Sequence, residues 1–234
     1  MPNQQNYPRV YVISLPQHQE RRDIISARLN RLGLKFEFFD GVDGRLLEEE
    51  ALKKVDLDFC EQKFGHRMNK SEIGCALSHI GIYEHMVKNN IDHAIILEDD
   101  AYLLSSTPRV IRSALDKCTD FDLLYLFHGK AKSWPLKTNL IEGYKLAKYR
   151  SPSKNSKRCM IGAVGYVLSL NGAKRLLELA YPVRMPADYL TGYLQSHKLK
   201  TYGIEPNCID TGHLDTTIPN RDYGTHIENE SPKI

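Results

Sequence analysis

An apolar run that stops at three consecutive acids places the tightest limit on the structure of this chain. Residues 94–97 (Ala-Ile-Ile-Leu) are followed directly by Glu98, Asp99 and Asp100. An apolar run closed by an abrupt charge change predicts a buried strand whose carboxyl end reaches the surface. Three adjacent carboxylates repel one another, so a cation is expected beside them. The competing interpretation is a solvated turn or a helix cap, because aspartate is common in both.

A metal ion is the cation that best fits this strand end. Hard divalent cations take oxygen ligands and keep some coordination positions for substrate phosphates. The acidic strand end is therefore predicted to hold a divalent cation against the diphosphate of a nucleotide-sugar.

Strand and helix patterns alternate along the rest of the chain. Apolar and β-branched runs predict strands at residues 9–15, 34–39, 94–98, 122–127, 159–169 and 201–204. Apolar residues at helical spacing predict helices at 17–32, 71–89 (capped by Ser71), 107–117, 171 onward and 187–197. This order predicts a single α/β domain over residues 1–234, with a mostly parallel sheet flanked by helices. Ligands of such sheets bind beyond the carboxyl ends of the strands, as at Leu15-Pro16 and at 98–100.

Composition excludes several classes of protein. The net charge of +3 is too small to indicate nucleic acid as a partner. No C-x-x-C pair occurs among the five cysteines, which argues against a disulfide framework and a zinc cluster and suits a reducing compartment. The first residues lack a basic stretch followed by an apolar one, and no apolar run approaches the ~20 residues that span a bilayer. We expect a cytoplasmic protein, with peripheral contact at the inner face of a membrane as its only membrane association.

Residues 130–158 differ from the rest of the chain in charge. They carry nine lysines and arginines against one acid, Glu142, together with the only tryptophan, Trp134. Two interpretations stay open: a mobile loop whose lysines aid solubility, or a surface for an anionic acceptor or lipid headgroups. Because the face of an indole ring suits the C–H groups of a sugar, Trp134 is our acceptor-side candidate.

Several blocks of sequence occur in order between residues 9 and 210. They are VYVISL at 10–15 with ERR at 20–22, FFDGVDG at 38–44, EIGCALSH at 72–79, ILEDDA at 96–101, and GYVLS at 165–169 with Gly172-Ala173. Together they resemble glycosyltransferase family 25, the bacterial lipooligosaccharide galactosyltransferases and their relatives. The resemblance implies a GT-A type (Rossmann-like) fold, a UDP-sugar donor, most often UDP-galactose, and a Mn²⁺-dependent inverting transfer. Residues 130–158 and those after 210 match the family poorly.

The resemblance also implies roles for the acids. By the family pattern Asp100 is the ligand of Mn²⁺ or another divalent cation, and Glu98 and Asp99 support it or bind the donor ribose. Inversion needs a base that takes the proton of the acceptor hydroxyl on the side opposite the leaving group. Asp188 matches the Pro-x-Asp element of the family and is our candidate, with helix capping as its competing role. The other candidates for the base are Asp210, Asp215 and Glu205.

Further residues are candidates for donor binding. Arg21 and Arg22 follow the first strand and could pair with the diphosphate, since a guanidinium binds phosphate through two hydrogen bonds; the competing role is a solvated helix face. Asp43 could accept from uracil or ribose, or serve only the turn in which it lies. The other candidates are Leu15, Pro16, Ser78 and His79 in the donor site, with His79 as a packing residue in the alternative, and a late histidine, His213 or His226, at the metal.

Two other functions compete with sugar transfer. A nucleotidyltransferase would also use carboxylates, a metal and a nucleotide, but residues 14–19 (SLPQHQ) lack the glycine-rich basic loop expected near its first strand. A non-catalytic nucleotide-sugar-binding module would be indicated by loss of the acidic triplet, and all three acids are present. We therefore predict a hexosyltransferase, and first a galactosyltransferase, that acts on a lipooligosaccharide or another surface glycan.

Overall fold

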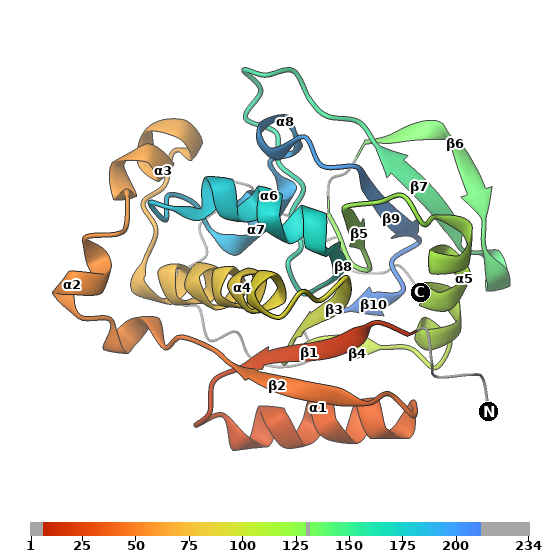
Figure 1. Cartoon of the computed structure of the whole chain (residues 1–234). Helices are drawn as coiled ribbons and strands as arrows, with labels where there is room; N and C mark the ends of the chain where they lie inside the picture. The colour runs from red at the N-terminus through yellow and green to blue at the C-terminus, as the bar shows by residue number, and fades with distance from the viewer. Residues whose placement is uncertain (1–6, 130–131, 212–234) are drawn as a thin grey trace, which may run out of the picture.

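The described residues, 7–129 and 132–211 of the computed structural model, are organised around one eight-stranded sheet (Figure 1). Its strand order is β2 (Phe36–Asp40), β1 (Arg9–Ser14), β3 (His93–Glu98), β8 (Gly165–Ser169), β5 (Leu123–Tyr125), β9 (Thr201–Glu205), β7 (Lys145–Tyr149) and β6 (Ser133–Asn139). A separate antiparallel pair joins β4 (Tyr102–Leu103) to β10 (Ile209–Asp210).

Most strands of the large sheet point the same way. β1 is parallel to β2 and β3, and β5 is parallel to β9. Only β8 and β7 run in the opposite direction, because β8 is antiparallel to β3 and β5, and β7 is antiparallel to β9 and β6. The predicted α/β class with a mostly parallel sheet is confirmed. The carboxyl ends of β1, β2 and β3 consequently meet at one edge of the sheet.

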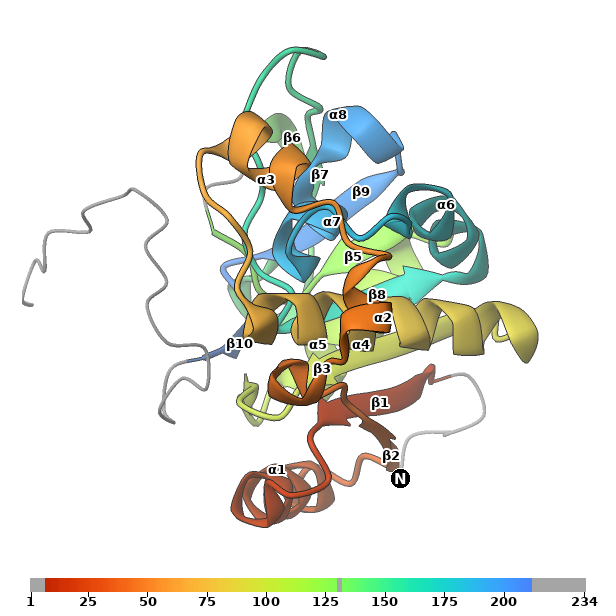
Figure 2. The same cartoon turned by 90° about the vertical axis from the view of Figure 1, so that its left-hand side faces the viewer.

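Helices cover both faces of the sheet (Figure 2). On one face, α1 (Gln19–Arg31) and α5 (Thr107–Lys117) pack against Val10 and Val12 of β1 and its neighbours. On the other, α4 (Lys70–Lys88), α6 (Leu170–Ala180), α7 (Ala187–Gly192) and α8 (Leu194–His197) contribute to the core that also contains Tyr11 and Ile13 of β1. Successive side chains of a strand point to opposite faces, so the apolar run of β1 serves both cores. The short helices α2 (Glu49–Leu52), α3 (Leu57–Phe64), η2 (Gly44–Leu46) and η3 (Ile141–Gly143) lie in connections.

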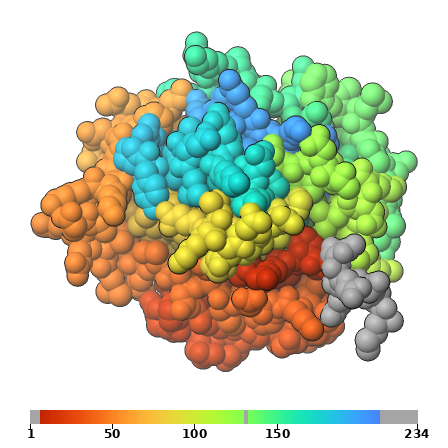
Figure 3. Space-filling model, in the orientation of Figure 1, coloured from red at the N-terminus to blue at the C-terminus, as the bar shows by residue number. Residues whose placement is uncertain are grey.

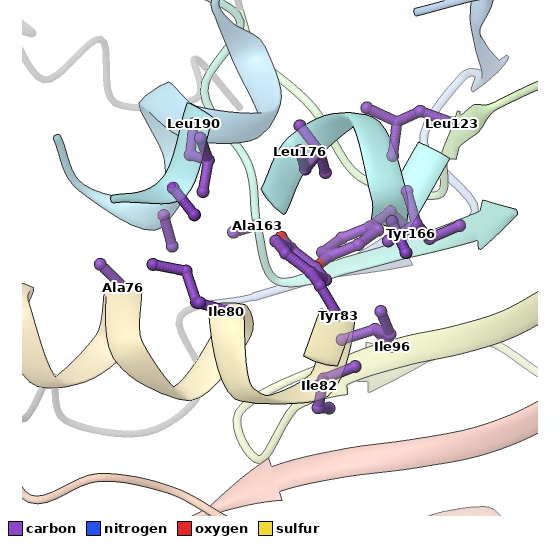
Figure 4. Packing of buried hydrophobic residues seen from close by; sticks show 14 of the residues in the cluster. Ala76, Ile80, Ile82, Tyr83, Ile96, Leu123, Ala163, Tyr166, Leu176 and Leu190 are labelled. Atoms are coloured by element: carbon purple, nitrogen blue, oxygen red, sulfur yellow. The ribbon is translucent and has the colours of Figure 1, made fainter. Parts of the chain in front are cut away.

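Helix α4 is the central helix of the second face. Its buried Ile80 and Tyr83 lie among Ile96 of β3, Tyr166 of β8 and Leu176 of α6 (Figure 4). In the space-filling view its yellow residues lie between the cyan residues of α6 and α7 and the red ones of the first strand (Figure 3). A helix enclosed in this way explains why its sequence is apolar and small on more than one side.

The first turn of α4 is fixed by a capping box and by close backbone packing. Asn69, not the predicted Ser71, is the N-cap: its side chain accepts from the Glu72 amide at 2.9 Å, and the Glu72 carboxylate accepts from the Asn69 amide at 2.9 Å. The Ser71 prediction was wrong because the reciprocal Asn-x-x-Glu pair lies two residues earlier. One turn on, Gly74 allows the 42–44 loop to lie directly against the helix: a Cβ there would be 2.5 Å from the Gly44 nitrogen.

Gly74→Ala is expected to destabilise the protein by about 1–3 kcal/mol, since the added methyl would press on backbone that cannot rotate away. Gly81→Ala on the same helix is the matched control, because its Cβ would meet only the Phe39 ring, at 3.3 Å. There the helix preference of alanine over glycine, up to about 1 kcal/mol, should offset the crowding. Urea denaturation of both variants measures the difference. Equal losses in the two would contradict the close packing at Gly74.

Three segments differ from their predictions. Only residues 165–169 of the predicted strand at 159–169 are extended in the sheet, and Gly162 before them has φ of +141°. The predicted helix at 187–197 is two helices that meet at Tyr193. Within 130–158, where no strand was predicted, β6 and β7 form an antiparallel hairpin at the edge of the sheet. Among the described residues no helix has the length and apolarity needed to cross a membrane.

Candidate active site

A cavity of about 390 Å³ lies at the carboxyl ends of β1, β2 and β3. One wall comes from the strand ends, at residues 13–15, 41–45 and 98–100. Helix α4 contributes Ser71, Cys75, Ser78 and His79, and the lining is completed by Ile161, Gly162, Val164 and Asp188 of α7. The acidic triplet predicted from sequence thus borders a cavity rather than bulk solvent, as the topology rule for such sheets requires.

Asp99 is held by side chains from the first strand and helix. Its carboxylate accepts from the Ser14 hydroxyl at 2.7 Å and from Arg21, through Nε at 2.8 Å and Nη2 at 2.5 Å. Asp99 is only 6% exposed. A buried carboxylate needs such partners, and Arg21 supplies the opposite charge and two donors to the same oxygen, Oδ1. Arg21 therefore positions the acidic strand end, and its Nη2 also lies 4.0 Å from Asp100.

Arg21→Met is expected to destabilise the protein by roughly 2–4 kcal/mol, because it leaves the Asp99 charge buried with much less compensation. The double variant Arg21→Met/Asp99→Asn removes that charge as well and should regain part of the loss. Urea denaturation of wild type, both single variants and the double variant forms the cycle. Strictly additive losses would show that Arg21 and Asp99 do not depend on one another.

Asp100 differs from its neighbour in its hydrogen bonding. Oδ2 accepts from the Thr211 hydroxyl at 3.2 Å, whereas Oδ1 is buried and has no hydrogen-bond partner among the described residues. Burial, reinforced by the nearby Glu98 charge, raises the pKa of Asp100 to about 6. A desolvated carboxylate oxygen without a donor is unfavourable by itself. A divalent cation would satisfy it, and the oxygen chemistry is right for Mg²⁺ or Mn²⁺. The residues present therefore fit the predicted metal site.

The Glu98 side chain contacts residues of helix α4. Its Oε1 lies 3.2 Å from Nε2 of His79 and 3.8 Å from the Cys75 sulfur. His79 is fully buried, and its Nδ1 lies 2.7 Å from the Tyr166 hydroxyl. Both candidates thus line the cavity, with His79 reaching it at the end of a buried polar chain.

The loop at residues 42–45 follows β2 and lines the cavity. Ser78 accepts from the Val42 amide at 2.8 Å and donates to the Gly74 carbonyl at 2.7 Å, so its hydroxyl anchors the loop to α4. Asp43 accepts from Gln17 at 2.8 Å and from both the amide and the guanidinium of Arg45. The Arg45 hydrogen bonds lower the pKa of Asp43 to about 2, so it stays ionised. Asp43 caps η2, as its predicted turn role requires, and it also borders the cavity, while its role in donor binding stays a prediction.

Asp188 borders the same cavity as the acidic triplet. Its Oδ1 accepts from the Ala163 amide at 2.6 Å and from the Gly162 amide at 3.3 Å. These bonds tie α7 to the segment before β8. The N-cap of α7 is Pro186 rather than Asp188, and the Asp188 carboxylate instead bonds to the amides at 162–163.

Most of the remaining candidates predicted from sequence lie outside the cavity lining. Arg22 pairs with Asp40 at 2.5 Å, donates to the Ser14 carbonyl and stacks over Phe38, which occupies its guanidinium at the edge of the sheet. Trp134 is 48% exposed on β6, with Arg150 over its ring. Leu15 lines the cavity but its neighbour Pro16 does not, nor do Glu205 and Asp210. Asp215, His213 and His226 lie outside the described residues.

Some lining residues were not predicted from sequence. His18, Arg45, Cys75, Thr211 and the 161–164 segment all border the cavity. Arg45 directly follows the block at 38–44, and Cys75 lies within the block at 72–79. Their positions in the sequence could therefore have identified them as candidates. Thr211 and 161–164 are far along the chain from the acidic triplet, and only the fold brings them to it.

Comparison with known proteins identifies relatives. The family model for "Glycosyltransferase family 25 (LPS biosynthesis protein)" matches residues 7–191. A "Glycosyltransferase 25 family member" from Aedes aegypti is 31% identical over 72% of this chain, and a "Putative glycosyltransferase" from Haemophilus influenzae is 32% identical over 72%. A bovine relative, "Probable inactive glycosyltransferase 25 family member 3", is 27% identical over 80%. The chain spans 28%, 56% and 31% of the lengths of these three proteins, respectively.

Proposed function

The chain belongs to glycosyltransferase family 25, and on that basis we propose that it is a metal-dependent inverting glycosyltransferase. Its donor would be a UDP-hexose, with UDP-galactose as the first candidate, and its acceptor a lipooligosaccharide or another surface glycan. The observation that carries the proposal is the buried Oδ1 of Asp100, which has no partner in the described residues and borders the cavity at the strand ends.

Asp100 would hold the cation in this scheme. Bound there, a divalent cation would supply positive charge that offsets the negative charge of the departing nucleoside diphosphate. Asp99 would not compete for the ion, since Ser14 and Arg21 already satisfy its oxygens. Arg21 would contribute positive charge beside the diphosphate. Asp43, which is ionised and borders the cavity, would accept a hydrogen bond from the uridine.

Asp188 would act as the base. A carboxylate that borders the cavity can take the proton of an acceptor hydroxyl as that oxygen attacks the sugar carbon. The Ala163 and Gly162 amides fix one of its oxygens, so the side chain needs little reorganisation on substrate binding.

The acceptor side is supported by charge. The β6–β7 hairpin and the residues after it carry most of the basic segment, and an anionic glycan or glycolipid would be attracted to it. Trp134, exposed beside Arg150, could stack on a sugar ring there. A glycolipid acceptor would place the protein at the cytoplasmic face of a membrane, in peripheral contact with its headgroups.

A non-catalytic, donor-binding protein is the second candidate. It is favoured by one specific observation: relatives of similar identity, such as the bovine one, carry names that call them inactive. The intact Asp100 and Asp188 favour the enzyme over this alternative.

The test is a panel of UDP-sugars incubated with the protein and Mn²⁺ in the absence of acceptor. Slow hydrolysis of one sugar nucleotide, lost with a chelator, is the result expected of the transferase. Calorimetry on the same panel completes the experiment. Binding of UDP-sugars without hydrolysis would favour the non-catalytic alternative, and absence of both would overturn the proposal.

A further inference from the structure

A second group of potential metal ligands lies beside the acidic triplet. Cys75 and His79 stand four residues apart on α4, and Glu98 ends β3 opposite them. One ligand atom of each lies within 4.8 Å of the other two, with Glu98 Oε1 at 3.2 Å from His79 Nε2 and 3.8 Å from the Cys75 sulfur. Residues at i and i+4 share one helix face, so α4 presents both side chains to the same point.

These separations suit a tetrahedral ion. With bonds of about 2.0–2.3 Å to nitrogen, oxygen and sulfur, tetrahedral ligands lie roughly 3.3–3.6 Å apart. The separations of 3.2 Å and 3.8 Å bracket that range, so only small side-chain movements would be needed. Sulfur and imidazole favour a borderline-soft ion such as Zn²⁺, whereas the oxygen chemistry of Asp100 favours a hard one. Cys75, His79 and Glu98 all border the cavity, so a fourth position would face its interior.

Buried hydroxyls behind His79 can support either tautomer of its ring. Nδ1 lies 2.7 Å from the Tyr166 hydroxyl, which lies 2.9 Å from the Tyr83 hydroxyl (Figure 4). Without an ion, His79 Nε2–H can donate to Glu98 while Nδ1 accepts from Tyr166. With an ion on Nε2, Nδ1–H can donate to Tyr166, and Tyr166 can then donate to Tyr83. Metal-bound histidines characteristically have such a partner on the second nitrogen.

We propose that Cys75, His79 and Glu98 form a second cation site, distinct from Asp100, that takes Zn²⁺ or a similar borderline-soft divalent ion. The ion binds through the Cys75 thiolate, and the thiol proton is released to solvent. His79 keeps one ring proton, which moves to Nδ1, and the Glu98 carboxylate binds without loss of a proton. The absence of a C-x-x-C pair in the sequence does not exclude this site. Two of its ligands lie on helix α4, and the third comes from strand β3.

Cobalt is the probe, because Co²⁺ bound by a thiolate in tetrahedral geometry gives a near-ultraviolet charge-transfer band and intense visible bands. We expect these bands in wild type, with one equivalent of Zn²⁺ abolishing them, and their loss in Cys75→Ser. Circular dichroism and thermal unfolding establish that Cys75→Ser is folded. Tyr166→Phe should keep the bands but weaken Zn²⁺ binding by roughly tenfold or more, since His79 Nδ1–H loses its acceptor.

Two controls separate this site from others. Cys60 also lies near a histidine, 3.8 Å from His66 Nε2, so Cys60→Ala is the matched cysteine control and should keep the bands. Asp100→Asn should keep them too, which makes the result independent of the proposed transferase chemistry. Bands that are absent from wild type, that survive Cys75→Ser, or that disappear in Cys60→Ala would overturn the proposal.

Discussion

Asp100→Asn is expected to lower metal-dependent turnover about a thousandfold, since the cation supplies several kcal/mol of transition-state stabilisation and asparagine is a poor ligand for it. The same variant is expected to stabilise the metal-free protein at pH 7 by about 2–3 kcal/mol. The pKa of Asp100, about 6, lies above the value near 4 of an unfolded aspartate, so the folded state holds this proton more tightly. Wild type therefore loses stability as the pH rises from about 4 to 6, and the variant does not.

Urea denaturation at pH 4 and pH 7, with and without Mn²⁺, measures both effects. The stability difference should be present at pH 7 and nearly vanish at pH 4, and Mn²⁺ should stabilise wild type alone. Asp116→Asn makes the same chemical change on an exposed position of α5 and should alter neither property. Full turnover of Asp100→Asn that a chelator still inhibits would remove Asp100 from the metal site.

Asp188→Asn should lower turnover by roughly 10²–10⁴-fold with little change in donor affinity, because the amide cannot take the acceptor proton. Asparagine keeps an oxygen that can accept from the Ala163 and Gly162 amides, so the contact between α7 and residues 162–163 should persist. Turnover and UDP binding are measured on the same preparation, and unchanged thermal unfolding shows that the local structure is retained.

Asp188→Ala is the companion variant, because it removes both the proton acceptor and the contact to 162–163. Equal turnover losses in the two variants, with instability confined to alanine, would assign the loss to the base. Near-normal turnover of Asp188→Asn would move the base elsewhere. Glu205 and Asp210 would then need a substrate-induced movement, since neither borders the cavity.

Much of the fold could be predicted from local patterns. The strands ending at Ser14 and Glu98 and the helix beginning at Thr107 were found because apolar runs, charge changes and a proline at the helix start are properties of adjacent residues. The extent of β8 was not found. Residues 159–164 are as apolar as a strand, but three of them (161, 162 and 164) border the cavity, and the amides at 162–163 donate to Asp188. A segment buried beside a cavity and a strand buried in a sheet are both apolar, so the sequence alone does not distinguish them.

The site divides along the same line. The acidic triplet and Asp43 were predicted because they follow strands whose ends must meet, a consequence of topology. The different hydrogen bonding of Asp99 and Asp100 could not be predicted. It depends on Ser14, Arg21 and Thr211, which are far from these residues in the sequence. Arg21 and Arg22 are adjacent and identical in type, yet one faces Asp99 and the other Asp40. Only helix α1's rotation relative to the sheet decides between them.

The β6 strand, last in the sheet, has a bearing on self-association. An outermost strand exposes backbone groups that can recruit another chain into a growing fibril, and Leu136, 89% exposed, would add to the attraction. Pro135 lacks an N–H to donate, and the pairing register shifts between Ser133 and Lys137. Lys132 precedes the strand and Lys137 lies within it. Each of these interrupts the flat, regular template that fibril growth requires. A concentrated solution of this protein should therefore remain dispersed even though the sheet is not closed on that side.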